Sequence, residues 1–141
     1  MQTPRTILSL LLLGAGLSVA ALAADVKLIA NSGVSASAIS ADELKGVFLS
    51  TKTSLSDGSH VEPVLLKAGA VHESFLKAYI GKTDSALETY YRSLVFTGKG
   101  SMPKMLAGDA EMVAYVAKTK GAIGYVSSGA NAAGVKTLEV K

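Results

Sequence analysis

The 141-residue chain contains no cysteine and no tryptophan, and it has only three prolines and two histidines. Without cysteine it has neither a disulfide staple nor a thiolate nucleophile. Its lysines and arginines form no cluster and few aromatic residues lie among them, which excludes a typical nucleic-acid-binding surface. Stability must therefore come from a hydrophobic core, and about half of the residues are apolar (49%).

The first 23 residues have the pattern of an export signal. Arg5 gives a basic start, an apolar segment follows, and Ala21-Leu22-Ala23 is a small-x-small cleavage site. We expect cleavage before Ala24 and a periplasmic location, with a retained membrane anchor as the alternative reading of the apolar segment. The absence of a following cysteine excludes a lipoprotein anchor.

The expected division is therefore a signal peptide at 1–23 and one domain at 24–141. Arg5 is the only charged residue of the signal, so the mature chain has 13 basic and 11 acidic residues and a net charge of +2. A mildly basic chain of this length is typical of one small globular domain.

The first half of the domain alternates strands with helices. We expect strands at 26–30 and 61–66, the second beginning near a sheet edge because it contains Pro63. The segment 31–38 is expected to be a loop. Ser40 and Glu43 form a capping-box pattern that starts a helix, and Asp57-Gly58 is a turn signal.

The second half predicts further helices and strands. We expect one helix over 71–80 that ends at Gly81, and a second capped by Asp84 or Ser85. The inward face of this second helix would consist of Leu87, Tyr90, Tyr91, Leu94 and Val95.

After it we expect a glycine-rich loop and a short helical turn that starts at Pro103. Asp109 would cap a helix after which Gly121 takes a left-handed conformation. Strands are expected at 122–126 and 135–140. This alternation predicts an α/β fold, a single compact domain with a small, parallel or mixed sheet flanked by helices.

Motifs for catalysis are poor. His60 with Glu62 and His72 with Glu73 could contribute metal ligands, but neither pair completes a coordination shell, so both histidines are expected to be surface or structural. No serine lies in a G-x-S-x-G elbow. We therefore expect no enzyme activity, no catalytic residue, no metal site and no cofactor.

Candidate anion contacts occur in three loops. The residues concerned are Asn31, Ser32, Ser50, Thr51, Gly98, Lys99, Gly100 and Ser101. The segment 98–101 combines glycines, a hydroxyl group and a cation ahead of an expected helix start, an arrangement whose N–H groups can converge on an oxyanion. An ordinary loop is the alternative for each segment, and for 98–101 the glycines would then serve only positive φ angles.

Several motifs together resemble phosphate-type substrate-binding proteins of ABC transporters, and most closely their short, single-domain relatives. Asn31-Ser32 resembles the Asn-Pro-Ser loop of that family. The stretch from Ser40 to Asp57-Gly58 is similar to its S-x-E-L-x-x-I-F segment and the following turn. Phe-Thr-Gly-Lys-Gly at 96–100 and Gly-Ala-Ile-Gly-Tyr-Val at 121–126 resemble its C-terminal part.

The resemblance covers nearly all of the mature chain and implies a periplasmic binding protein-like fold of type II. It also implies phosphate or a similar oxyanion as the ligand, and an ABC transporter permease or another envelope protein as a partner. The chain departs from the family after the second strand. Full-length phosphate binders carry an Arg…Ser-Gly-Thr motif there, whereas residues 65–71 read Leu-Leu-Lys-Ala-Gly-Ala-Val, with Lys67 as the nearby cation.

Two hypotheses of different classes follow. The first is a periplasmic substrate-binding-like protein that binds phosphate or a similar oxyanion weakly. The second is an envelope interaction module that keeps the fold and has lost the ligand. The missing Arg…Ser-Gly-Thr motif favours the second hypothesis, and the glycine-rich loop at 97–101 favours the first.

Overall fold

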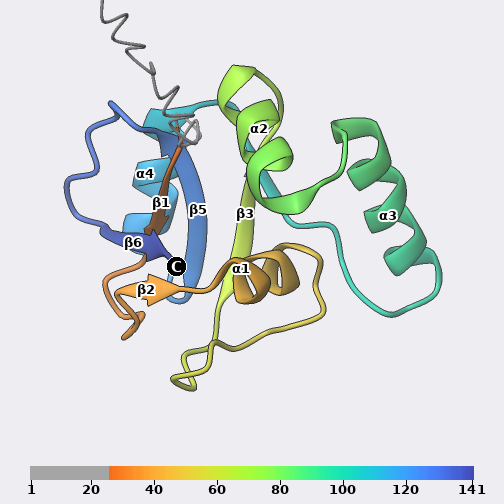
Figure 1. Ribbon diagram of the computed structural model, residues 1–141, viewed down its shortest axis with the longest axis horizontal. Coiled ribbons are helices and arrows are strands. Elements are labelled where there is room, and N and C mark those ends of the chain that lie inside the picture. Colours follow the sequence, from red (N-terminus) through yellow and green to blue (C-terminus); the bar gives the residue numbers. More distant parts are fainter. Residues whose placement is uncertain (1–25) are drawn as a thin grey trace, which may run out of the picture.

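The computed structural model describes residues 26–141, so the expected export signal and its cleavage site lie outside the described residues. Within these residues, six strands and four α-helices follow one another (Figure 1). The strands are β1 (Val26–Ala30), β2 (Ala38–Ile39), β3 (Glu62–Leu66), β4 (Lys104–Leu106), β5 (Ala122–Ser127) and β6 (Lys136–Val140). The helices are α1 (Ala41–Phe48), α2 (Ala70–Phe75), the π-helical segment η1 (Leu76–Ile80), α3 (Asp84–Phe96) and α4 (Asp109–Lys118).

The strands form one mixed sheet in the order β2-β6-β1-β5-β3-β4. β1 is antiparallel to both of its neighbours, β5 and β6, while the other pairs are parallel. The expected mixed α/β architecture is therefore confirmed. Because β1 runs against the rest, its last residue lies beside the first residues of β5, and Ala30 pairs with Ile123.

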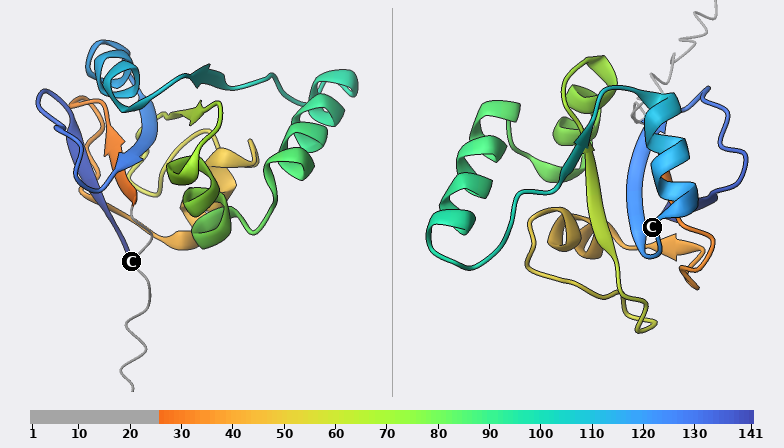
Figure 2. Two further views of the ribbon diagram at one scale, coloured as in Figure 1. Left: turned by 90° about the horizontal axis from the view of Figure 1, so that it is seen from above. Right: turned by 180° about the vertical axis from the view of Figure 1, so that it is seen from behind.

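Helices cover both faces of the sheet. Two views in Figure 2 show α4 on one face and α1 with α2 on the other. Neighbouring residues of β5 point to opposite faces, as the period of a strand requires. Gly124 faces Met112 of α4 so closely that a Cβ would lie 2.5 Å from its sulfur, whereas Tyr125 stacks on Phe75 of α2.

The start of α1 is as the sequence predicts. Ser40 Oγ accepts the N–H of Glu43 at 3.1 Å, and the Glu43 carboxylate accepts the N–H of Ser40 in return. Asp57-Gly58 is the expected turn, with Gly58 at a φ of 86°. The expected loop 31–38 ends in the short strand β2, which pairs with β6 and could not be recognised from two residues.

The helices after β3 differ from expectation in detail. The helix expected over 71–80 is α-helical only to Phe75 and continues as the π-helical η1, which ends as predicted at Gly81, in the left-handed region. Thr83, and not Asp84 or Ser85, caps α3 through a bond from the N–H of Ala86. Pro63 lies in an inner strand, but β4 pairs with β3 only from Val64 onward.

The segment from Pro103 to Asp109 is the main local error of the sequence prediction. No helical turn begins at Pro103, because residues 104–106 form β4 beside β3. Gly108 is the N-cap of α4, and Asp109 is its first helical residue. The Asp109 carboxylate instead accepts the hydroxyl and the N–H of Ser127, which joins the helix start to the end of β5.

The hydroxyl groups of three tyrosines bond to protein atoms. Tyr91 is buried and donates to the carbonyl of Phe48, and the half-buried Tyr90 donates to that of Leu49. Tyr125 is buried, and its hydroxyl accepts the N–H of Leu66 and is hydrogen-bonded to His72. Burial raises the pKa of both Tyr91 and Tyr125, so both hydroxyls stay neutral at physiological pH.

Candidate functional site

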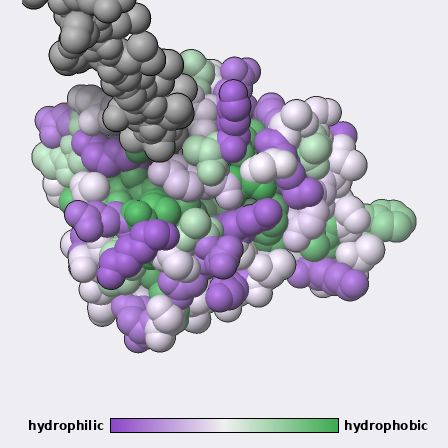
Figure 3. Space-filling view, in the orientation of Figure 1, coloured by the Kyte–Doolittle hydropathy of each residue, from purple (hydrophilic) through white to green (hydrophobic). Residues whose placement is uncertain are grey.

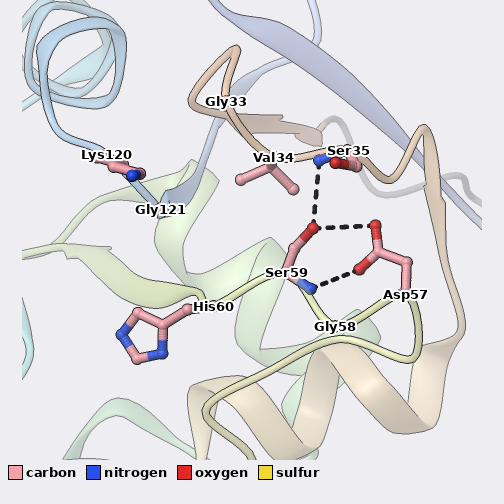
Figure 4. Close-up of a pocket in the computed structure, with 9 residues that line it drawn as sticks. All are labelled: Gly33, Val34, Ser35, Asp57, Gly58, Ser59, His60, Lys120 and Gly121. Atoms are coloured by element: carbon pink, nitrogen blue, oxygen red, sulfur yellow. Dashed lines mark hydrogen bonds between the residues drawn. The ribbon is translucent and has the colours of Figure 1, made fainter.

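The best candidate site is a hollow of about 550 Å³ at the end of β1, where the chain leaves the sheet (Figure 4). It is lined by three loops, from Gly33 to Ser35, from Asp57 to His60, and at Lys120 and Gly121. The loops come from separate parts of the sequence and meet because β1 ends where β3 and β5 begin. We call this hollow the β1-end hollow.

Asn31 fixes the first of these loops. Its side chain is buried and donates to the carbonyls of Val116 (2.8 Å) and Ala117 (3.2 Å) at the end of α4. Its Oδ1 accepts the N–H of Gly33 at 2.9 Å, which turns the chain away from the strand. All of these partners are protein atoms, so the side chain of Asn31 supports the hollow rather than lining it.

The other wall is fixed by a glycine. Gly121 has a φ of 79°, a conformation that favours glycine, and a Cβ there would lie 2.9 Å from the carbonyl oxygen of His60. The carbonyl of Gly121 accepts the N–H of Glu62 at 2.8 Å. The two loops are thus held in contact through their backbones. The expected left-handed conformation of Gly121 is confirmed.

A chain of hydrogen bonds crosses the hollow (Figure 4). The N–H of Ser35 donates to Ser59 Oγ at 3.2 Å, and Ser59 Oγ donates to Asp57 Oδ2 at 3.0 Å. The N–H of Ser59 donates to Asp57 Oδ1 at 2.9 Å. These bonds, first the one from the backbone of Ser59, hold the pKa of the Asp57 carboxyl below its usual value, so it is ionised at neutral pH.

Basic side chains lie on the rim of the hollow and behind its first loop. Lys120 and His60 lie on the rim of the hollow and are exposed, and His60 Nε2 lies 3.9 Å from Glu62. Behind the first loop, Lys136 Nζ donates to the carbonyls of Val34 (3.0 Å) and Ser35 (2.9 Å). The hollow therefore combines the hydroxyl of Ser35 and an exposed ammonium group with one carboxylate acceptor, whose bonds to Ser59 are already made.

This set of groups suits recognition of a small polar ligand. A carboxylate accepts hydrogen bonds and cannot donate them when ionised, whereas serine hydroxyls do both.

Within residues 26–141, His, Asp and Glu side chains nowhere gather in threes around a position that could hold a metal ion. In the same region, no helix has the length and hydrophobicity needed to cross a bilayer.

The sequence-predicted contact residues fall at three places. Ser32 is exposed beside the β1-end hollow, next to the buried Asn31. Ser50 and Ser101 meet in a second, smaller depression of about 220 Å³, which Lys104 also lines. Thr51 donates its hydroxyl to the carbonyl of Gly46 and so closes the end of α1. The structure thus brings Ser50 and Ser101 together but separates them from Asn31 and Ser32.

The structural premise for the loop 98–101 is wrong. Gly98, at a φ of 70°, donates its N–H to the carbonyl of Val95, and Lys99 donates to that of Leu94. These two bonds form a Schellman cap on the C-terminus of α3. They point the amides at the negative end of a helix, and the next element after the loop is the strand β4 and not a helix. Anion binding there stays a prediction that now rests on Gly100, Ser101 and the side chain of Lys99.

Sequence reasoning missed most of the β1-end hollow. Ser35, Ser59 and Lys120 carry no motif of their own. Asp57 was interpreted only as part of a turn, and His60 was expected to be a surface or structural residue. The sequence feature that could have indicated the hollow was the carboxyl end of β1, because ligands of open α/β sheets bind at such strand ends. The loops that complete the hollow come from positions about 25 and 90 residues further along, a proximity that depends on the sheet order.

Comparison with known proteins gives matches by structure and none by sequence. No family model matches the chain, and no curated protein matches it. An ABC-type phosphate transport receptor from Vibrio cholerae superposes with a TM-score of 0.63 and 16% identity over 82% of this chain and 45% of that chain. The chain has the fold of the phosphate-type substrate-binding proteins. This confirms the fold class that the motifs indicated.

Two further structures agree with this conclusion. A phosphate ABC transporter substrate-binding protein from Clostridium perfringens with bound phosphate has a TM-score of 0.60 and 17% identity over 82% of this chain and 44% of that chain. PstS from Borrelia burgdorferi has a TM-score of 0.62 and 14% identity over 82% of this chain and 47% of that chain. The chain therefore spans less than half the length of each of these three proteins.

Proposed function

We propose that the chain is an exported substrate-binding-like protein that binds phosphate, or a similar oxyanion, weakly in the β1-end hollow. The observation that carries this proposal is the match of 82% of the chain to phosphate receptors, one of them solved with bound phosphate. Binding without catalysis agrees with the poor catalytic motifs of the sequence.

The groups in the hollow favour a protonated oxyanion. The Ser35 hydroxyl and the Lys120 ammonium group can donate hydrogen bonds to phosphate oxygens, whereas both donors of Ser59 already serve Asp57. The ionised carboxylate of Asp57 repels a bare anion but accepts the proton of hydrogen phosphate. Sulfate carries no proton at neutral pH, so the same carboxylate selects against it. We therefore expect phosphate to bind more tightly than sulfate.

Affinity should be low for three reasons. The hollow is open to water, which competes for every hydrogen bond. The matched part covers less than half of each receptor, so it lacks the groups that the rest of a receptor could place around the ligand. Arg92, the one arginine among residues 26–141, lies on α3 and does not line the hollow. We expect a dissociation constant no tighter than roughly micromolar, or about −8 kcal/mol.

Calorimetric titration of the mature chain, residues 24–141, with phosphate and with sulfate tests this function. Phosphate should release or absorb heat with a micromolar to millimolar midpoint, and sulfate should bind less tightly. Lys120→Ala should weaken binding, while the matched variant Lys118→Ala, at an exposed lysine outside the hollow, should not. Asp57→Asn should narrow the difference between phosphate and sulfate, because an amide can donate to sulfate.

The same titration decides between the two proposed positions. Lys99→Ala combined with Ser101→Ala removes the polar side chains of the 98–101 loop, and loss of binding in that variant alone would place the anion there. Nanomolar binding of phosphate would contradict the open, carboxylate-containing site.

The absence of any heat with phosphate would favour the second candidate, an envelope interaction module. A specific observation supports this candidate: the amides of Gly98 and Lys99 already serve the cap of α3. A transporter permease or another envelope protein would then be the partner. Intact mass of protein recovered from the periplasm tests export separately, and a mass that includes residues 1–23 would contradict cleavage before Ala24.

A further inference from the structure

The β1-end hollow has more room than inorganic phosphate needs. Its volume is about 550 Å³. Sites that hold whole organic molecules measure roughly 300–1,000 Å³. At about 30 Å³ for a water-sized group, the five heavy atoms of a phosphate ion occupy on the order of 150 Å³. A ligand that uses the whole hollow is therefore larger than the ion itself.

The polar side chains of the hollow are divided between two sides. Figure 4 shows Lys120 and His60 on one side, which we call the basic side. It shows Asp57, Ser59 and Ser35 on the other, which we call the acidic side. The ammonium group and the imidazole of the basic side are exposed and can both donate hydrogen bonds to a phosphate group.

The acidic side offers hydrogen-bond acceptors to a ligand. The two oxygens of the ionised Asp57 carboxylate accept one bond each from Ser59, at 2.9 and 3.0 Å. An ionised carboxylate has about four lone-pair sites, so about two of them remain for other donors. A hydroxyl group can fill these sites, whereas a bare phosphate oxygen there would meet a charge of its own sign.

An apolar side chain lies between the two sides. Val34 lines the hollow between Lys120 and Asp57 in Figure 4, and only 2% of its surface is exposed. Its carbonyl accepts a hydrogen bond from Lys136 Nζ at 3.0 Å, which holds this part of the loop in place. A short hydrocarbon segment can pack on Val34 without leaving a polar group unpaired.

We propose that the β1-end hollow binds a small phosphate monoester of a polyol, with the phosphate group at the basic side, the carbon segment over Val34 and hydroxyl groups at Asp57. This inference deepens the function proposed above and rests on it. The arrangement separates the anionic group of the ligand from the carboxylate, so Asp57 contributes to binding. Inorganic phosphate has no second group and can meet Asp57 only through its own proton.

The surface around the hollow suits a short, polar ligand. At the lower edge of the molecule in Figure 3, where the loops of the hollow end, the residues are mostly hydrophilic or neutral. A long hydrocarbon chain leaving the hollow on this face would lie against polar side chains. The buried Val34 is matched by a carbon segment of a few atoms, which is the size of a small polyol.

Calorimetric titration with two esters of equal length tests the proposal. Glycerol 3-phosphate and propyl phosphate each carry three carbons and one phosphate group, and they differ only in two hydroxyl groups. The mature chain, residues 24–141, should bind glycerol 3-phosphate roughly fivefold or more tightly than propyl phosphate, as expected for one or two additional hydrogen bonds. It should also bind glycerol 3-phosphate more tightly than inorganic phosphate.

Asp57→Asn tests the acidic side. The amide keeps the size of the side chain, but its one oxygen is already needed by the N–H of Ser59. The preference for glycerol 3-phosphate over propyl phosphate should therefore fall to less than about twofold. Because this preference is a ratio measured in one protein, a partly folded sample does not change it.

Two further variants separate the contributions. Asp42→Asn, at an exposed aspartate of α1 outside the hollow, is the matched control and should keep the full preference. Lys120→Ala should weaken both esters to a similar extent, because both carry the same phosphate group. A preference for glycerol 3-phosphate that persists in Asp57→Asn would overturn the assignment of the hydroxyl groups to the acidic side.

The titrations distinguish failure of this inference from failure of the proposed function. Equal affinities for inorganic phosphate, propyl phosphate and glycerol 3-phosphate would overturn the polyol ester and leave phosphate binding in place. The absence of heat with all three would overturn both.

A diester separates a free polyol phosphate from a lipid headgroup. Glycerophosphoglycerol, the headgroup of phosphatidylglycerol, has the same hydroxyl groups but only one negative charge on its phosphate. It should bind more weakly than glycerol 3-phosphate, because the attraction to Lys120 is smaller. Tighter binding of the diester would overturn the monoester and assign the hollow to a lipid headgroup.

Discussion

The side-chain amide of Asn31 donates to the carbonyl oxygen of Val116 at 2.8 Å and so joins the end of β1 to the end of α4. The residue resembles a ligand contact in sequence, yet its amide is occupied within the protein. The same contact places the loop 33–35 at the rim of the β1-end hollow, so it shapes the site without touching its contents.

Replacing Asn31 by aspartate keeps the shape and removes both N–H donors. The buried carbonyls of Val116 and Ala117 would then face a carboxylate, and we expect a loss of about 2–3 kcal/mol in the free energy of unfolding at pH 7. Acidification protonates the new carboxyl and returns one donor, so the deficit should shrink as the pH falls. Urea denaturation at pH 7 and pH 4 measures both effects. Equal stability of the two proteins at pH 7 would mean that the contact is not formed.

The buried tyrosine of β5, Tyr125, is predicted to stabilise the fold through the hydrogen bonds of its hydroxyl. Tyr125 Oη accepts the N–H of Leu66 at 3.0 Å and bonds His72, whose other nitrogen lies 2.8 Å from Asp84. Tyr125→Phe leaves the N–H of Leu66 without an acceptor and should cost about 1–3 kcal/mol.

The matched control is Tyr79→Phe. Tyr79 is half-buried, and its hydroxyl has no hydrogen-bond partner among the described residues, so its removal should change stability by less than about 0.5 kcal/mol. Thermal denaturation compares the two variants. Equal effects at both positions would show that the network around Tyr125 adds nothing to stability.

The capping box of α1 gives a third prediction. Ser40→Ala removes the acceptor of the Glu43 N–H and should cost about 1 kcal/mol, measured as a shift of the urea midpoint. Ser128→Ala, at an exposed loop residue, serves as the control. An unchanged midpoint in Ser40→Ala would contradict a functional cap.

Glu43 also makes this corner of the protein sensitive to pH. Hydrogen bonds from Ser56, first from its side chain and then from its backbone, hold the pKa of the Glu43 carboxyl below its usual value. Because the folded pKa is depressed, the stabilisation is present above the unfolded pKa and is lost as the pH falls through the folded one. The difference in stability between wild type and Glu43→Gln should therefore disappear in acid.

Gly121 gives the fifth prediction. Alanine there meets both a positive φ and a backbone oxygen 2.9 Å from its Cβ, so Gly121→Ala should cost about 2 kcal/mol or more and should also weaken phosphate binding. Gly129→Ala is the matched control, since a Cβ at that position meets nothing within 4 Å and its φ is not positive. Calorimetric scanning and titration of both variants measure the two effects.

The sequence predicts those elements of the fold whose signals are local. The capping box at Ser40, the stop at Gly81 and the apolar strand at 122–126 depend on neighbouring residues and are confirmed. β4 was missed because three residues become a strand only by pairing with β3, and Pro103 before them resembles a helix start. The cap by Thr83 was missed because three polar candidates stand in a row.

The candidate site was harder to predict for a related reason. Glycines and a lysine at 98–101 match the composition of an anion loop, but the same residues match a Schellman cap, and the direction of the amides separates the two. Asn31 was placed correctly at the strand end, yet no local feature indicates that its amide faces α4. Asp57 and Ser59 approach Ser35 only through the order of strands in the sheet.

The pairing of β1 has a consequence for how the chain can fold. Its hydrogen-bonded neighbours are β5 and β6, about 100 residues further along, so its backbone groups find partners only when the last strands have been synthesised. Contacts of such long sequence separation slow folding, because a large loop must close first. In a nascent chain, β1 therefore stays unpaired until synthesis is nearly complete. That delay suits the export proposed above, in which the polypeptide would cross the membrane unfolded before its sheet closes.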